Sequence, residues 1–390
     1  MPRNPIRRRD LLKAGLVASI AATGMPQDGP PQGSSSPPGN VSLREKFFGC
    51  IAGCHIGSAM AAPVEGWSSE RIEKEHGTLD RLLPYEHYGN RWMREPGTTE
   101  DGCERQKLMI TAILEKKDRV TAEDVRAIWV RDIKPESAGK VSEPFEATLL
   151  AMAKSGLPAV DLGRYCDYAG LVSMARSCHP LGLINAGDVR GAVADVHEVG
   201  QLYQTAQSRG IRWACVTAVA IAAATRPGAT VETVIEAIRA HCDPGVVREV
   251  DRGLQTAAGC ATFRELRQAF EKVYSGTGVP YAFSYANEVV TKAVAIFRMT
   301  RGNLRETIIA GVNMGRDTDC VTAISSGISG ALGGGSTLPP EWIEQVDRAT
   351  KLNVYTNSQR TLRQHSDGLY EAFKERLRRM KAHVELMDRN

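Results

Sequence analysis

Apolar residues recur at helical intervals along nearly the whole chain from Ser42 onward. Apolar positions spaced three and four residues apart are typical of amphipathic α-helices. Turn residues such as glycine and proline separate one periodic stretch from the next. The pattern predicts amphipathic helices over residues 42–62, 103–117, 121–133, 143–156, 230–242, 245–259, 261–276, 285–300 and 304–313.

Two further segments differ from this pattern. Residues 211–225, "IRWACVTAVAIAAAT", are apolar all round, which predicts a central buried helix. Residues 361–387 are rich in charge on one face and predict a helix on the outside of the fold. The chain contains no run of alternating strands and no internal repeat. We therefore predict an all-α fold, a single compact helical bundle formed by one domain over residues 43–390.

The first 42 residues have a different composition. Residues 8–13, "RRDLLK", resemble the twin-arginine export signal, and a short apolar run follows over residues 14–22. That run is too short to span a membrane. We predict a signal peptide over residues 1–24 and a Pro/Gly/Ser-rich linker over residues 25–42. A disordered basic tail is the alternative.

The basic charge belongs to this signal. The 390-residue chain has 49 basic and 45 acidic residues, and residues 1–24 hold five of the former and one of the latter, which leaves 44 of each sign. The mature protein thus has no excess positive charge with which to bind nucleic acid. We expect it to use the twin-arginine export machinery, to have no stable membrane span, and to reside in the periplasm or outside the cell.

Two aspartates stand one residue apart near the C-terminus. Asp317 and Asp319 lie in a run that is otherwise small and apolar, "AGVNMGRDTDCVTAISSG". Residues i and i+2 share a side only in an extended segment, so we predict a loop followed by a helix with Thr318 or Asp319 as N-cap. Either the pair binds a cation, or one aspartate caps the helix and the other is solvated.

Acidic residues also precede another predicted helix. Thr99, Glu100 and Asp101 follow a Pro-Gly turn and place oxygen ligands just before the helix that starts at Cys103. A further carboxylate, Glu65, follows the proline that ends the first helix.

These three segments together resemble the ADP-ribosylglycohydrolase family, which includes the dinitrogenase reductase activating glycohydrolases. Residues 57–65, "GSAMAAPVE", are similar to the family's G-D-A-x-G-x-P-x-E pattern. Residues 99–102, "TEDG", stand for its T-D-D-T segment, and residues 313–320, "NMGRDTDC", for its late G-x-D-x-D-T segment. The later "LPPEW" also fits, and the resemblance covers about residues 43–350.

The resemblance implies a helical bundle with two Mg²⁺ ions, or Mn²⁺ in their place. Their ligands would be Thr99, Glu100 and Asp101 from one segment, and Asp317 and Asp319 from the other. Mg²⁺ prefers such hard oxygen donors, and paired metal ions can position a nucleophilic water. The water would attack the anomeric carbon of an ADP-ribosyl or related ribosyl group, on a small molecule or an ADP-ribosylated substrate.

The resemblance also assigns residues outside the metal site. It implies that Glu65 is the acid/base group, whereas a lone glutamate after a proline is otherwise most often a surface residue. Residues 167–182 take the place of the family's substrate loop. There Ser173 and Arg176 are predicted to contact phosphate, a role that suits arginine well. A helix-packing turn with a surface arginine is the alternative.

The chain departs from the family pattern at several positions. Ser58 replaces an aspartate, Gly102 a threonine, and Cys320 a threonine whose hydroxyl is a harder ligand than a thiol. These changes keep open a non-catalytic ligand-binding or scaffold protein, and the export signal keeps open a hydrolase of another glycoside. The absence of a P-loop, a dinucleotide fingerprint, a G-x-S-x-G elbow and an HExxH motif argues against four other enzyme classes.

Overall fold

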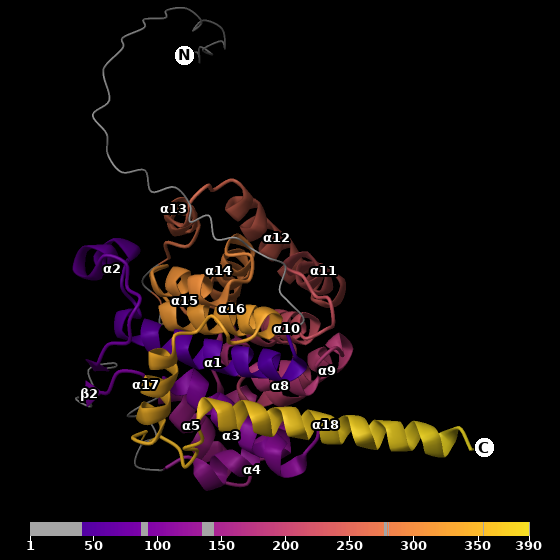
Figure 1. The fold of residues 1–390 in the computed structure, drawn as a ribbon. Helices are drawn as coiled ribbons and strands as arrows, with labels where there is room; N and C mark the ends of the chain where they lie inside the picture. Colours follow the sequence, from indigo (N-terminus) through magenta and orange to yellow (C-terminus); the bar gives the residue numbers. More distant parts are fainter. Residues whose placement is uncertain are drawn as a thin grey trace, which may run out of the picture. The chain divides into compact units, whose positions relative to one another are not determined.

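Two helices from opposite ends of the chain form the centre of the fold. Helix α1 (Leu43–Ala61) and helix α16 (Thr318–Gly333) lie side by side (Figure 1) and are buried along almost their whole length. Their backbones touch where glycines face each other. A Cβ atom on Gly330 would lie 1.9 Å from the carbonyl oxygen of Gly49. This close approach requires glycine and fixes the position of the aspartates at the start of α16.

The computed structural model describes residues 41–86, 93–134, 144–276, 279, 281–353 and 355–389. The predicted signal and the linker up to residue 40 lie outside these residues. Within them, one unit includes all the helices. Besides α1 and α16, these are α2 (Ser69–His76), α3 (Asp101–Lys116), α4 (Ala122–Asp132), α5 (Pro144–Lys154), α6 (Ala159–Leu162), α7 (Ser173–Ser177), α8 (His179–Ile184), α9 (Val189–Val199), α10 (Arg209–Ala224), α11 (Val231–His241), α12 (Pro244–Ala258), α13 (Phe263–Val273), α14 (Ala286–Met299), α15 (Leu304–Val312), α17 (Pro340–Thr350) and α18 (Leu362–Met387).

The prediction of an all-α fold is confirmed. Two strands of two residues each, β1 (Tyr85–Glu86) and β2 (Met93–Arg94), pair antiparallel and make up the sheet structure of the described residues. Short 3₁₀ turns also occur at Ala62–Val64, Gly163–Tyr165 and Gly200–Leu202.

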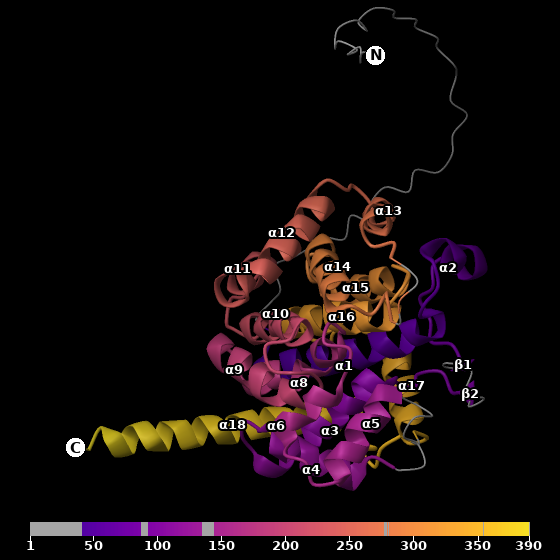
Figure 2. The same ribbon diagram turned by 180° about the vertical axis from the view of Figure 1, so that it is seen from behind.

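Helix α10 is the central buried helix that its apolar sequence predicts. It contacts α7, α8, α9, α11, α14 and α16, and Figure 2 shows it beside α9 and α11. Almost every side chain in it is buried, including Trp213. Since an all-round apolar helix leaves no polar face for water, this enclosed position is the one that its composition favours.

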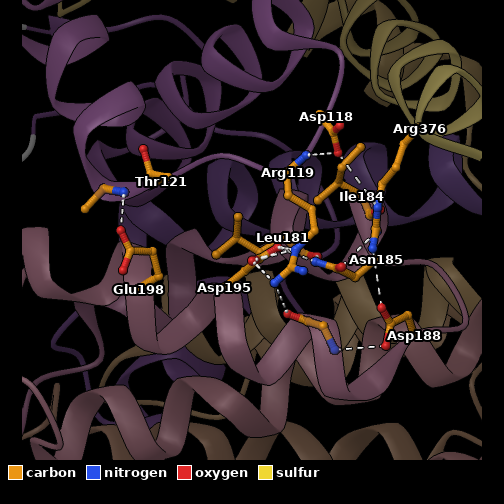
Figure 3. A network of polar contacts seen from close by, with 12 residues as sticks. Asp118, Arg119, Thr121, Leu181, Ile184, Asn185, Asp188, Asp195, Glu198 and Arg376 are labelled. Atoms are coloured by element: carbon orange, nitrogen blue, oxygen red, sulfur yellow. Dashed lines mark hydrogen bonds and ion pairs between the residues drawn. The ribbon is translucent and has the colours of Figure 1, made fainter. Parts of the chain in front are cut away.

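Helix α18 lies on the outside, as its charged face predicts. Its first half packs on α1, where the rings of Tyr370 and Phe373 contact Phe47. Midway along, Arg376 donates to the carbonyl oxygen of Ile184 at 2.6 Å and to Asn185 Oδ1 at 2.9 Å (Figure 3). These bonds satisfy polar groups at the end of α8 and attach the outer helix to the body of the fold.

Helix α1 has the length and apolar composition of a membrane-spanning segment. The segment Leu43–Val64 is apolar enough to span a bilayer by length and composition, and 94% of its most apolar stretch is buried inside the fold. Such burial is typical of a core helix, and α1 is a core helix of this fold.

All nine cysteines are free thiols, and seven of them are buried, in agreement with their apolar helical contexts.

One sequence-based expectation about local structure is wrong. The stretch 167–182 is not a loop throughout, because Ser173–Ser177 and His179–Ile184 form helices α7 and α8. Both are short and buried, and both pack against α10. Short buried helices lack the long periodic pattern from which a helix is predicted.

Candidate metal centre

The first acidic segment lies at the N-terminus of α3. Glu100 is its N-cap and accepts hydrogen bonds from the backbone N–H groups of Gly102 at 2.6 Å and Cys103 at 3.0 Å. Ser58 on α1 donates to Glu100 Oε1 at 2.8 Å. The serine that replaces the family's aspartate therefore holds Glu100 in place. Three donors fix this carboxylate at the positive end of a 16-residue helix.

The second acidic segment lies at the N-terminus of α16. The N-cap is Asp317, whose Oδ1 accepts from the N–H of Cys320 at 3.3 Å, and the helix begins at Thr318. The prediction of Thr318 or Asp319 as N-cap is thus one or two residues late. The cause is Arg316, which adopts a left-handed φ of 67° and turns the chain before Asp317. Sequence periodicity does not reveal such a turn at a non-glycine residue.

Two oxygens of this second segment are buried without a hydrogen-bond donor in the part of the chain that the structure describes. They are Asp317 Oδ2 and Asp319 Oδ1. Each aspartate is 1% exposed. The ligand atoms of Asp317, Asp319 and Cys320 all lie within 4.8 Å of one another. Since a buried carboxylate without a partner is costly, these oxygens create a site that a cation would stabilise.

The two acidic segments and Glu65 share one electrostatic environment. Burial raises the pKa of the Asp319 carboxyl well above its ordinary value, and the negative charges of Glu65, Asp317 and Glu100 raise it further. Burial likewise raises the pKa of Glu100, with Asp101 as the next cause. The structure therefore brings together four of the five predicted metal ligands and the predicted acid/base group. Glu65 is partly exposed, whereas the four other carboxylates are buried.

The fifth predicted ligand, Thr99, is engaged differently. Its hydroxyl donates to Glu104 Oε1 at 2.7 Å and accepts from Lys107 Nζ at 3.0 Å. Lys107 and Glu104 form a buried ion pair at 2.6 Å. The Thr99 side chain thus helps to hold a salt bridge behind the acidic cluster, on the α3 side.

The two predicted substrate residues lie on α7. Ser173 is its first residue and is buried. Arg176 points into the acidic cluster, where it forms two hydrogen bonds to Asp101, one of them 3.2 Å long, and contacts Glu100 Oε2 at 3.4 Å. It also lies 3.8 Å from the Cys320 sulfur. The predicted substrate arginine is therefore paired with two of the predicted metal ligands.

Sequence reasoning missed Glu146 on α5. It pairs with Arg105 at 3.1 Å and lies 3.6 Å from Arg176. Burial raises the pKa of Glu146 to about 7, with Arg105 opposing this shift and Asp101 adding to it. No motif includes Glu146. Its one signal in the sequence is a glutamate inside the apolar run "PFEATLLAMA".

The chemistry of the donors favours a hard divalent ion. Carboxylate oxygens suit Mg²⁺ and Mn²⁺, whereas a thiol suits softer metals. The Cys320 thiol donates to Asp319 Oδ2 at 3.6 Å, so it acts here as a donor. Asp317 and Asp319 are the residues that would hold the ion.

The fold and this site define a class of all-α proteins in which two helix N-termini present carboxylates to each other. The model of the ADP-ribosylglycohydrolase family matches residues 40–377. The chain belongs to this family.

The chain is also similar to individual proteins. The uncharacterized protein YegU of Escherichia coli is 23% identical over 343 residues, which cover 83% of this chain and 99% of YegU. An uncharacterized protein of Archaeoglobus fulgidus is 26% identical over 310 residues, 77% of this chain and 92% of its own length. A solved structure described as an ADP-ribosylglycohydrolase-related protein complex has a TM-score of 0.61 at 18% identity, over 86% of this chain and 98% of that chain. The last similarity establishes the fold.

Proposed function

We propose that this protein is a divalent-metal-dependent glycohydrolase that cleaves the bond at the anomeric carbon of an ADP-ribosyl or related ribosyl group. The observation that supports this most is the pair of buried oxygens, Asp317 Oδ2 and Asp319 Oδ1, which have no hydrogen-bond donor among the described residues. Membership of the ADP-ribosylglycohydrolase family supports the class of reaction. Mg²⁺ is the proposed ion, with Mn²⁺ as a substitute.

In this proposal the chain's own residues position the reaction. Asp317 and Asp319 hold the ion, and the N–H of Cys320 keeps Asp317 oriented. When bound, the ion would supply Lewis-acid stabilisation and lower the pKa of a water molecule. Glu65 is partly exposed beside this cluster, so it can take a proton from the attacking water. Ser58 and the start of α3 hold Glu100 nearby.

The substrate side of the proposal follows from the family. A ribosyl group would enter past Glu65, since the other carboxylates of the cluster are buried. The substrate is a small molecule or an ADP-ribosylated protein. Phosphate contact by Ser173 and Arg176 stays a prediction, and Arg176 would have to exchange its carboxylate partners for phosphate.

The alternative function is a non-catalytic ligand-binding or scaffold protein. The pairing of Arg176 with Asp101 and Glu100 favours it, because charge compensation by the protein itself reduces the need for metal. A hydrolase of another glycoside is the alternative that export suggests.

We propose export through the twin-arginine machinery. A chain with Arg8 and Arg9 both changed to lysine should then accumulate in the cytoplasm.

The test of catalysis is the release of ADP-ribose from an ADP-ribosylated peptide, with Mg²⁺, Mn²⁺ or EDTA. We expect metal-dependent turnover that Asp319→Asn abolishes and that Glu65→Gln lowers about a hundredfold or more. Asp195→Asn is the matched control, since Asp195 is a buried aspartate of α9 outside the cluster. Turnover that survives EDTA and Asp319→Asn would contradict the proposal. Metal binding without turnover of any glycoside would favour the scaffold.

A further inference from the structure

The acidic cluster already contains a cation from the protein. The Arg176 side chain is 6% exposed and enters the cluster from α7. Its guanidinium contacts both oxygens of Asp101 and Oε2 of Glu100. A fork of N–H donors on a carboxylate is the strongest form of such pairing. The α3 carboxylates thus have a cationic partner from the protein, while two oxygens on the α16 side have no donor within the described residues.

Gly102 makes room for this arrangement. A Cβ atom on Gly102 would lie 2.7 Å from Cδ of Arg176 and 3.0 Å from its Cγ and Nε. Heavy atoms that are not hydrogen-bonded do not approach so closely. Any side chain at position 102 would therefore move Arg176 away from the start of α3. Gly102, which departs from the family's T-D-D-T segment, thus leaves the space that the Arg176 side chain fills.

The carboxylate oxygens of Glu100 and Asp101 at the start of α3 already accept hydrogen bonds from the protein. Glu100 Oε1 accepts from Ser58 and Cys103, and Glu100 Oε2 accepts from Gly102 and lies near Arg176. Both oxygens of Asp101 are bonded to Arg176. A divalent ion on this side would have to share these oxygens with a positive guanidinium at close range, which is unfavourable in a buried site.

We propose that Arg176 is a built-in cation that replaces one divalent ion, so that this protein binds a single ion, at Asp317 and Asp319. The inference rests on the proposed function, because it concerns the metal content of the same site. In it Arg176 is a positioning residue that fixes Asp101 and Glu100. Gly102 is the residue that permits it.

Metal stoichiometry tests this directly and does not depend on turnover. Isothermal titration of the metal-free protein with Mn²⁺, with bound Mn²⁺ also counted by electron paramagnetic resonance, should give one ion per chain. Arg176→Ala and Gly102→Ala should each give two ions, and Arg176→Lys should stay at one. Arg376→Ala is the matched control and should stay at one, because Arg376 is also a buried arginine, 7% exposed, but lies outside the cluster.

Each result separates this inference from the proposed function. Two ions in the unchanged protein would overturn the inference and leave the glycohydrolase proposal standing. No ion at all would overturn both. One ion in both Arg176→Ala and Gly102→Ala would show that the arginine does not occupy a metal position. If Arg176→Ala does not fold, Gly102→Ala carries the test, because its added methyl group meets only the movable side chain of Arg176 within 3.0 Å.

Discussion

Two clusters of arginines and carboxylates in this protein differ in their balance of charge. In the network that joins α18 to α8 and α9, Arg119 and Arg376 face Asp118, Asp188 and Asp195 (Figure 3). Arg379 also pairs with Asp118. In the acidic cluster, one arginine, Arg176, faces Glu100, Asp101 and Glu146, whereas Asp317 and Asp319 form no ion pair within the described residues.

The difference shows how a structural cluster is distinguished from a functional one. Asp195 is buried, but both its oxygens accept from Arg119, at 2.8 and 3.0 Å, and Asn185 adds another bond. Asp317 and Asp319 each keep a buried oxygen without a donor in the described residues. A network whose charges are matched stabilises the fold, whereas unmatched buried charge is retained at a stability cost, which is typical of active sites.

The largest expected effect concerns the balanced network. Arg119→Ala should destabilise the protein by about 3 kcal/mol, because it leaves the carboxylate of Asp195 buried without its main partner. Denaturant unfolding measures this loss. Arg239→Ala is the control, since its pairs with Glu236 and Asp251 are exposed and should contribute less than about 1 kcal/mol. Equal losses in the two variants would show that the buried carboxylate of Asp195 does not depend on Arg119.

In the acidic cluster, removing a charge should change the stability in the opposite direction. In EDTA, Asp319→Asn should stabilise the protein by about 1 to 2 kcal/mol, because it removes an uncompensated buried charge at nearly constant volume. Asp195→Asn should destabilise it, because there the charge has a partner. Denaturant unfolding of both variants measures the two changes in the free energy of unfolding. A loss of stability in Asp319→Asn would mean that its charge is compensated after all.

A smaller effect concerns the buried histidine His365 on α18. Burial, followed by the charges of His55 and Lys107, lowers the pKa of His365 well below its ordinary value. The unfolded chain then binds a proton that the folded chain excludes, so stability is present above a pH of about 6.5 and is lost below it. One pH unit below that value the loss is about 1.4 kcal/mol.

The variant His365→Leu should remove this part of the acid sensitivity. The ring of His365 is fully buried on α18, and its nitrogens bond to no group in the described chain. Melting temperatures at several pH values measure the effect. The exposed His383 on the same helix provides the control, and His383→Leu should leave the pH profile unchanged. An unchanged profile in His365→Leu would show that other groups cause the acid sensitivity.

The fold could be predicted because its signals are local. Helical periodicity gave α1, α3, α10 and α18, and the acidic residues just before two predicted helices pointed to the site. The N-cap of α16 was misplaced because Arg316 adopts a left-handed backbone conformation that its type does not favour.

The partners inside the site could not be predicted, since they are brought together only by tertiary packing. Nothing in the local pattern places Arg176 on Asp101, which lies 75 residues earlier in the chain. Thr99 is turned toward Glu104 and Lys107, which belong to the first two turns of α3. Gly102 was visible as a departure from a motif, but its meaning depends on the arginine that fills the space beside it.

In the proposed function, Asp317 and Asp319 form a site for a divalent ion. The most direct test is the melting temperature of the protein in EDTA, in Mg²⁺ and in Mg²⁺ with ADP-ribose, beside Asp317→Ala. At a hundred times its dissociation constant, Mg²⁺ should stabilise the fold by about 2.7 kcal/mol, with a further shift from ADP-ribose. Both shifts should vanish in Asp317→Ala. No shift with Mg²⁺ in the unchanged protein, or the same shift in the variant, would contradict the claim.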